Sequence, residues 1–223
     1  MKRGLYINRL LTKELKLFAA PLTYFFLTFS LMTLIPGYPI LMGSFFVCFG
    51  IFQSFQLGRE TNDVLYTVLL PIKKSDAVKA RFEFVVLIEL MGFVLMAILT
   101  AVRMTVLSGA APYVQNPLMS ANPVYLAFVL IIYAAFNLIF VRQFYKTAYK
   151  IGKPFIIFIV AALIITGIAE ALHYLPGLSF LNAVSGEEMT TNYLILAAAA
   201  VVYALVTYLA YKASCYSFES VDF

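Results

Sequence analysis

Six long apolar stretches divide this chain, and each is close to the roughly 20 residues that an α-helix needs to cross a hydrocarbon core about 30 Å thick. They run over residues 17–35, 40–57, 84–107, 124–140, 155–172 and 193–211. Hydrophobic residues make up 63% of the chain and charged residues only 12%, about half the share of a soluble domain. The pattern predicts an all-α integral membrane protein, with one domain of six transmembrane helices over residues 1–223.

The lysines and arginines between these stretches fall on alternate segments. Residues 1–16 and 58–83 hold five each, residues 141–154 hold four, Lys212 follows the last span, and residues 36–39, 108–123 and 173–192 hold none. Fifteen of the sixteen basic residues therefore belong to one side of the membrane. Because basic loops stay on the cytoplasmic side, this distribution predicts a multi-pass protein with both termini cytoplasmic.

The net charge of +5 does not indicate a nucleic-acid-binding protein. The basic residues flank the apolar spans, where anionic lipid headgroups lie. A basic patch on a soluble fold, which nucleic-acid binding would require, is not apparent. We therefore expect membrane lipid, and not nucleic acid, to contact these charges.

The first sixteen residues have the period of an amphipathic helix. Ile7, Leu10 and Leu11 share an apolar face, with basic residues opposite, which predicts a helix lying in the inner membrane interface. Glu14 falls near the apolar face, where a carboxylate bathed in lipid would be costly, so we expect that face to contact protein. The alternative is a basic leader that serves only to set the topology.

The loop after the second span predicts a short cytoplasmic helix. Thr61 or Asn62 can cap its start, Asp63 in the first turn favours the helix dipole, and Pro71 ends it. An apolar stripe along this helix consists of Val64, Leu65, Val68 and Leu69. Such a helix needs a surface on which to dock, and the alternative is that it rests on lipid headgroups.

Motifs for catalysis are absent from the sequence. It contains no G-x-x-x-x-G-K-[ST] phosphate-binding loop, so the chain cannot hydrolyse ATP by that route. Glu170 and His173 have ligand spacing, but His173 is the only histidine, which leaves a zinc site and a Ser/His/Asp triad without their other members. We expect no enzyme activity, no metal and no cofactor on this chain.

Three charged residues fall inside the apolar spans, where an ionisable side chain is a functional candidate by default. They are Glu89, Arg103 and Glu170. Glu89 and Arg103 lie about 21 Å apart along one helix and cannot pair, so Glu89 is expected to face another helix or a polar cavity. Arg103 and Glu170 are both near the outer boundary and are predicted to pair; the alternative is a purely structural role.

One further segment, residues 172–192, is too apolar for a free external loop and too broken by Pro176-Gly177 to span the membrane. It is expected to be able to dip into the outer leaflet as a re-entrant turn, provided that neighbouring helices satisfy its backbone.

In layout the chain resembles a type 2 ABC exporter permease. The most specific stretch begins at Glu60 and reads ETNDVLYTVLLPIKKSDAVKAR. It is similar to the coupling loop of small Firmicutes permeases, including those of the phenol-soluble-modulin exporter type. An acidic start, a leucine-rich turn, Leu-Pro and a basic-then-acidic helix start recur in those loops.

The resemblance implies a coupling helix over residues 63–70 that docks on a separate ABC ATPase subunit, with the interface helix (Ile7, Leu10, Leu11, Glu14) beside it. The implied coupling residues are Glu60, Asp63, Val64, Leu65, Val68, Leu69 and Pro71. It also implies a second permease chain, as homodimer or heterodimer, ATP and Mg on the partner ATPase, and a bacterial cell membrane.

The implied function is export of an apolar or amphipathic substrate, such as a peptide, by alternating access. The chain's 21 Phe and 15 Tyr suit such a passenger, but they suit helix packing and interfacial belts equally well. The alternative is a non-transporting membrane immunity or sensor subunit, which would not require a docked ATPase.

Overall fold

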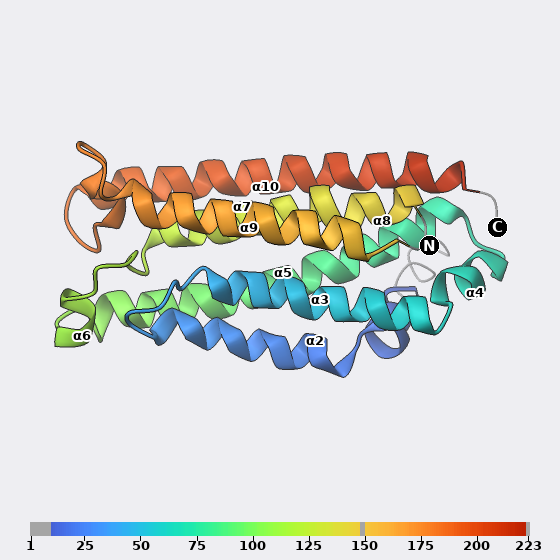
Figure 1. Cartoon of the computed structure of the whole chain (residues 1–223), viewed down its shortest axis with the longest axis horizontal. Coiled ribbons are helices and arrows are strands. Elements are labelled where there is room, and N and C mark those ends of the chain that lie inside the picture. The colour runs from blue at the N-terminus through green and yellow to red at the C-terminus, as the bar shows by residue number, and fades with distance from the viewer. Residues whose placement is uncertain (1–9, 148–149, 222–223) are drawn as a thin grey trace, which may run out of the picture.

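The computed structural model describes residues 10–147 and 150–221, and these residues form an elongated bundle of helices that run along its long axis (Figure 1). In chain order the elements are η1 (Glu14–Phe18), α2 (Pro21–Phe26), η2 (Leu27–Leu34), α3 (Met42–Glu60), α4 (Asp63–Leu69), α5 (Lys74–Thr105), α6 (Ala111–Val114), α7 (Pro123–Phe136), η3 (Asn137–Val141), α8 (Arg142–Thr147), α9 (Gly152–Leu172), η4 (Ser179–Asn182) and α10 (Glu188–Glu219). No strand occurs within the described ranges.

Within the described residues, four helices are long and apolar enough to cross a membrane. The first is α5, and the second is the continuous helical run Pro123–Thr147, which comprises α7, η3 and α8. The third and fourth are α9 and α10. The bent pair Leu10–Phe18 and Pro21–Leu34 would be a fifth if it counts as one span. The protein is therefore a multi-pass, all-helical membrane protein with four or five candidate spans. The second predicted span, residues 40–57, falls mainly on α3. This helix is not one of the candidate spans, because its second half holds polar residues such as Gln53, Gln56 and Arg59.

The leader meets the first apolar helix at an angle of 89°. Ala19 and Ala20 are extended, and Pro21 begins α2, where its missing N–H costs nothing. Of the predicted interface residues, Leu10 is buried, Leu11 packs against the core, and Ile7 lies outside the described residues.

Small and hydroxylated residues hold α2 against α3. The Thr23 hydroxyl donates to the Gly50 carbonyl at 2.6 Å and lies 2.7 Å from the Ser54 hydroxyl, which also accepts from the Ala20 N–H at 2.9 Å. A Cβ at Gly50 would stand 2.8 Å from the Phe26 Cβ. This close approach of two backbones is what small residues permit in membrane bundles.

The centre of the bundle is α7. In the most apolar part of the helical run that begins with α7, 72% of the residues are buried within the chain. The corresponding share for α10, which packs against α7, is 11%. Phenylalanine rings extend the core toward α3 and α9; the rings of Phe52 and Phe155 stack at 3.8 Å. Because α5, α9 and α10 leave apolar faces uncovered, those faces meet lipid or another chain.

At the end of the bundle that the charge pattern predicts to be external, called the outer end below, the segment between α9 and α10 is hydrogen-bonded to the bundle. The Asn122 amide donates to the carbonyls of Leu181 and Ala183 at 2.7 and 3.0 Å. Its side-chain oxygen accepts from the Tyr125 N–H and so caps α7. Neighbouring side chains thus satisfy backbone groups of this segment, the condition stated above for a re-entrant turn; whether it enters a leaflet stays a prediction.

Gly50→Ala should weaken the α2–α3 contact. The added methyl group has no space beside Phe26, and overpacking of this kind costs about 1–3 kcal/mol. The thermal midpoint of the purified protein in detergent should fall by several degrees. Gly167→Ala in α9 is the control, because nothing lies within 4 Å of its added Cβ. Equal midpoints for both variants would contradict the close packing of these helices.

Candidate functional site

Four charged side chains from three separate segments converge at the end of the bundle that the charge pattern predicts to be cytoplasmic, called the inner end below. Lys13 and Glu14 come from the leader, Asp63 from the first residue of α4, and Arg81 from the second turn of α5. The Arg81 Nε lies 2.5 Å from Glu14 Oε2, and its Nη2 lies 2.5 Å from Asp63 Oδ2. Lys13 Nζ lies 2.6 Å from Asp63 Oδ1 and 3.1 Å from Glu14 Oε1. We call these four residues the inner charge cluster.

The inner charge cluster is largely removed from solvent. Glu14 is 2% exposed and Arg81 4%. The Arg81 guanidinium also lies 3.4 Å from the centroid of the Phe18 ring, a cation–π contact made stronger by desolvation. Loss of one member of such a buried ion pair is strongly destabilising, because it leaves an uncompensated buried charge.

Asp63 has a structural role in this arrangement. Burial tends to raise the pKa of the Asp63 carboxyl, but the neighbouring Arg81 and Lys13 outweigh it and hold the pKa below its ordinary value of 3.8. The ionised carboxylate is thus the bound form, and its stabilising contribution is complete at neutral pH and is lost only as the pH falls through that lowered pKa. Glu14 contacts protein as expected, and its partners are residues of the same chain.

The short helix α4 begins at Asp63 as predicted and ends one residue before its expected end. The predicted side-chain cap is wrong: Asn62 adopts a left-handed conformation with φ of 54° and makes no cap bond, and the Thr61 hydroxyl donates to the Leu57 carbonyl at the end of α3. Electrostatic contacts of Asp63 hold the start of α4 in place of a cap.

The apolar stripe predicted on α4 divides between two directions. Val64 is buried and Val68 packs against the core, whereas Leu65 is 40% exposed and Leu69 74% exposed. The exposed side also includes Tyr66 and Leu70. Glu60 and Pro71, at either end of the loop, are exposed too. The inner end of the bundle therefore presents an uncovered apolar surface that consists of Leu65, Tyr66, Leu69 and Leu70.

A second polar group lies inside the bundle. Glu89 is fully buried, and its Oε2 accepts from the Tyr203 hydroxyl at 2.7 Å and from the Asn137 amide at 3.0 Å. As expected, Glu89 faces other helices. The sequence reasoning missed Asn137 and Tyr203, although Asn137 is the only amide side chain in the stretch 124–140. Asn137 also begins the π-helical turn η3, a distortion common at functional positions.

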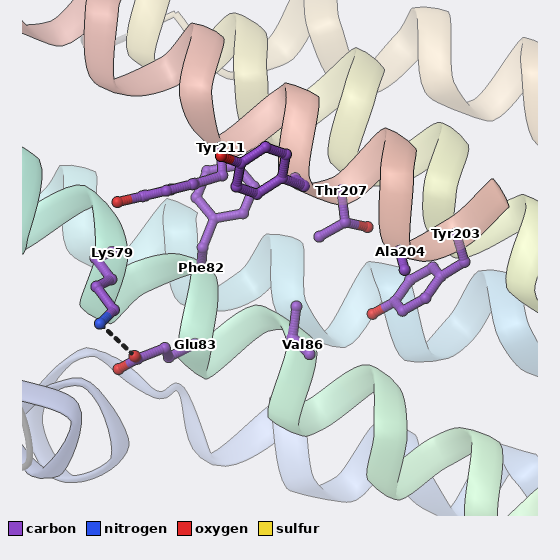
Figure 2. A pocket seen from close by; sticks show the side chains of 9 residues that line it. Lys79, Phe82, Glu83, Val86, Tyr203, Ala204, Thr207 and Tyr211 are labelled. Carbon is purple, nitrogen blue, oxygen red and sulfur yellow. Dashed lines mark ion pairs between the residues drawn. The ribbon is translucent and has the colours of Figure 1, made fainter. Parts of the chain in front are cut away.

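A groove of about 380 Å³ lies beside Glu89, between α5 and α10 (Figure 2). Its lining is Lys79, Phe82, Glu83 and Val86 from α5 and Tyr203, Ala204, Thr207, Tyr208 and Tyr211 from α10. Two of these residues connect it to the buried polar group: Tyr203 donates to Glu89, and the Thr207 hydroxyl lies 3.1 Å from the Asn137 amide. The groove is thus aromatic and apolar at its surface, with a hydrogen-bonded carboxyl group behind it.

The predicted ion pair between Arg103 and Glu170 is wrong. Arg103 Nη1 donates to the Thr33 carbonyl at 2.8 Å, and Glu170 Oε2 accepts from the Met119 N–H at 2.7 Å. Arg103 binds the end of η2, whereas Glu170 binds the segment before α7. Similar depth in two helices was not sufficient evidence for contact. Among the described residues, no group of three His, Cys, Asp or Glu side chains could hold a metal ion.

Comparison with protein families supports this layout. Residues 9–219 match the family described as ABC-2 family transporter protein. The chain therefore belongs to this family, whose members are membrane permease subunits and not ATPases, and membership implies an ABC ATPase partner. Searches of curated proteins and of solved structures find no match.

Arg81→Gln should destabilise the inner end of the bundle by about 3–5 kcal/mol, because Glu14 and Asp63 would lose a buried cation. The yield of folded protein and its thermal midpoint in detergent should both fall. Lys79→Gln is the matched control: its pair with Glu83 is partly exposed, at 3.6 Å, and such pairs contribute less than about 1 kcal/mol. If Arg81→Gln were as stable as Lys79→Gln, the inner charge cluster would have no structural role.

Proposed function

We propose that this chain is the transmembrane subunit of a bacterial ABC exporter, acting as a dimer with two separate ATPase subunits. The observation that carries the proposal is α4: buried ion pairs fix it to the leader and to α5, while its outer side presents uncovered apolar residues. A rigid helix with an uncovered apolar side suits attachment to a moving partner. The bacterial cell membrane and the ATP and Mg of the ATPase follow from the same proposal.

The proposed coupling mechanism is mechanical. Closure of the ATPases on ATP would move α4, and the pair between Asp63 and Arg81 would pass that movement into α5. This helix has 32 residues, about 48 Å of continuous rod, and reaches the outer end of the bundle. Movement of one rigid element relative to its neighbours is a common way to switch a protein between two states.

Each predicted coupling residue receives a distinct role in this proposal. Leu65, Tyr66, Leu69 and Leu70 would contact the ATPase, with Glu60 and Pro71 at the margins. Val64 and Val68 would hold α4 to the bundle, and Asp63 would transmit force. The leader, through Leu10, Leu11 and Glu14, would act as the interface helix that braces α4.

We also propose six spans with both termini cytoplasmic, with α3 as the second span. Figure 1 supports this arrangement, because α3 runs alongside α2 and the described ends of the chain lie at the same end of the bundle as α4. The basic residues Arg59, Lys74 and Arg142 belong to that end, and basic loops favour the cytoplasm.

The groove between α5 and α10 favours an amphipathic substrate, which is the passenger proposed from the resemblance to peptide exporters. Its aromatic walls suit apolar groups, while Lys79 and Glu83 offer charge near the inner boundary. Outward transport of such a molecule, with a second permease chain completing the path, is the function we propose.

Leu69→Asp or Tyr66→Asp should uncouple the permease from its ATPase without unfolding it, because both side chains are largely exposed in the single chain. A charge in a docked apolar contact costs 2 kcal/mol or more, about a thirtyfold loss of affinity. The measurement is co-purification of a candidate ABC ATPase expressed with the permease, together with substrate-stimulated ATP hydrolysis.

Tyr216→Asp is the matched control, since Tyr216 is 81% exposed at the same end of the bundle but lies on α10. Loss of the ATPase from the α4 variants alone would support coupling. Full co-purification in all three variants would argue that α4 rests on headgroups, and would favour the non-transporting immunity or sensor subunit.

Cysteine labelling tests the topology. In a chain with Cys215→Ser, Thr190→Cys should react with an impermeant maleimide in intact cells, and Lys73→Cys only after permeabilisation. Both sites are exposed, and the remaining Cys48 is buried. Labelling of Lys73→Cys in sealed cells would contradict the proposed orientation.

A further inference from the structure

The outer end of α5 holds an arginine without a carboxylate partner. Arg103 is 4% exposed, and in the described part of the chain no Asp or Glu lies within ion-pair distance of it. Glu170, the carboxylate that the sequence predicted as its partner, accepts a hydrogen bond from the Met119 N–H instead. A buried cation with no counter-ion is costly, and proteins rarely retain one.

Part of the guanidinium has a structural task. The 3-10 helix η2 ends at Leu34, and its final carbonyls have no partner within the helix. Arg103 Nη1 donates to the Thr33 carbonyl at 2.8 Å, and the Tyr113 hydroxyl donates to the Leu34 carbonyl at 2.9 Å. This capping uses one of the five N–H groups of an arginine. Among the residues that the structure describes, no other acceptor binds the guanidinium.

Arg103 borders a pocket of about 260 Å³. Arg103 lines it together with Ser108, Tyr113 and Ser120, which supply hydroxyl groups, and Val184 and Ala121 form apolar wall. The Tyr113 ring lies 4.7 Å from the Arg103 guanidinium carbon and holds it in place. The pocket thus combines a fixed positive charge with the hydroxyl groups of Ser108 and Ser120, and its lining includes no acidic side chain.

We propose that this pocket binds a phosphate group. An arginine fork matches two oxygens of a phosphate, and charge-assisted hydrogen bonds of this kind are about twice as strong as neutral ones. The hydroxyl groups of Ser108 and Ser120 in the wall can donate to the other oxygens. The phosphate can belong to a lipid headgroup or to free inorganic phosphate, and both present negatively charged phosphoryl oxygens to Arg103.

The proposal is independent of the exporter function. It concerns the outer end of the bundle, whereas coupling to an ATPase concerns α4 at the inner end. An anion at Arg103 would bridge α5 to the segments that contain Tyr113 and Ser120, and so stabilise the outer end in one arrangement.

The test uses the full chain in a maltoside detergent, which carries no phosphate, and in mixed nanodiscs of phosphatidylcholine and phosphatidylglycerol. Calorimetric titration with inorganic phosphate measures the free anion, and native mass spectrometry of the protein released from mixed nanodiscs measures retained phosphatidylglycerol. Arg103→Gln should lower phosphate affinity or lipid retention at least tenfold. Arg142→Gln, which removes an exposed charge at the inner end, is the control and should leave both unchanged.

Arg103→Gln also weakens the cap on η2, so a second variant separates binding from folding. Ser108→Phe places a ring at the pocket and leaves the Arg103–Thr33 bond in place. If Arg103→Gln and Ser108→Phe both abolish binding of inorganic phosphate, the pocket is a site for the free anion. If these variants lower only the retention of phosphatidylglycerol, it is a site for a lipid headgroup. Absence of both signals in the unmodified protein, or equal signals in Arg103→Gln and Arg142→Gln, would overturn the proposal.

Discussion

The architecture of the inner end depends on one interaction: the Arg81 guanidinium held between two carboxylates from different segments. Each carboxylate belongs to a piece of chain too short to be stable alone. The leader has about two described turns, and α4 has seven residues; helices of this length are unstable in water. Arg81 fixes both to α5, the longest rod of the bundle besides α10. A buried ion pair of this kind fixes the positions of the segments it joins more than it adds to the net free energy of folding.

The interior of the bundle handles its other polar residues differently. Glu89 has no cation within ion-pair distance in the described chain; its neighbours are an amide and a phenol. Arg103 has a carbonyl and an aromatic ring. The two intramembrane charges of α5 are therefore both held by neutral groups, Glu89 at the middle of the helix and Arg103 near its C-terminal end. Because neutral partners bind a charge less firmly than an opposite charge does, these are the positions where a ligand or a proton has most effect.

Much of the architecture followed from the sequence. Hydrophobic runs located the long helices, and Asp63 and Pro71 marked the bounds of α4 to within one residue. Periodicity also indicated that Glu14 contacts protein. The partners of buried side chains were harder to predict. Arg103 and Glu170 have opposite charge and similar depth, yet each binds a backbone group on a different segment. Rotation of a helix about its axis, and turns such as Asn62 with positive φ, depend on tertiary contacts that a linear pattern does not contain.

The 89° bend between the leader and α2 has a mechanical consequence for the membrane itself. If the leader is the interface helix proposed above, it lies in the plane of the headgroups and cannot follow a span that tilts. In a thinner bilayer α5 would then tilt to keep its apolar length in hydrocarbon, while the leader would stay in the surface plane. Because Arg81 joins the two, bilayer thickness would then set the angle at which α4 meets its proposed partner.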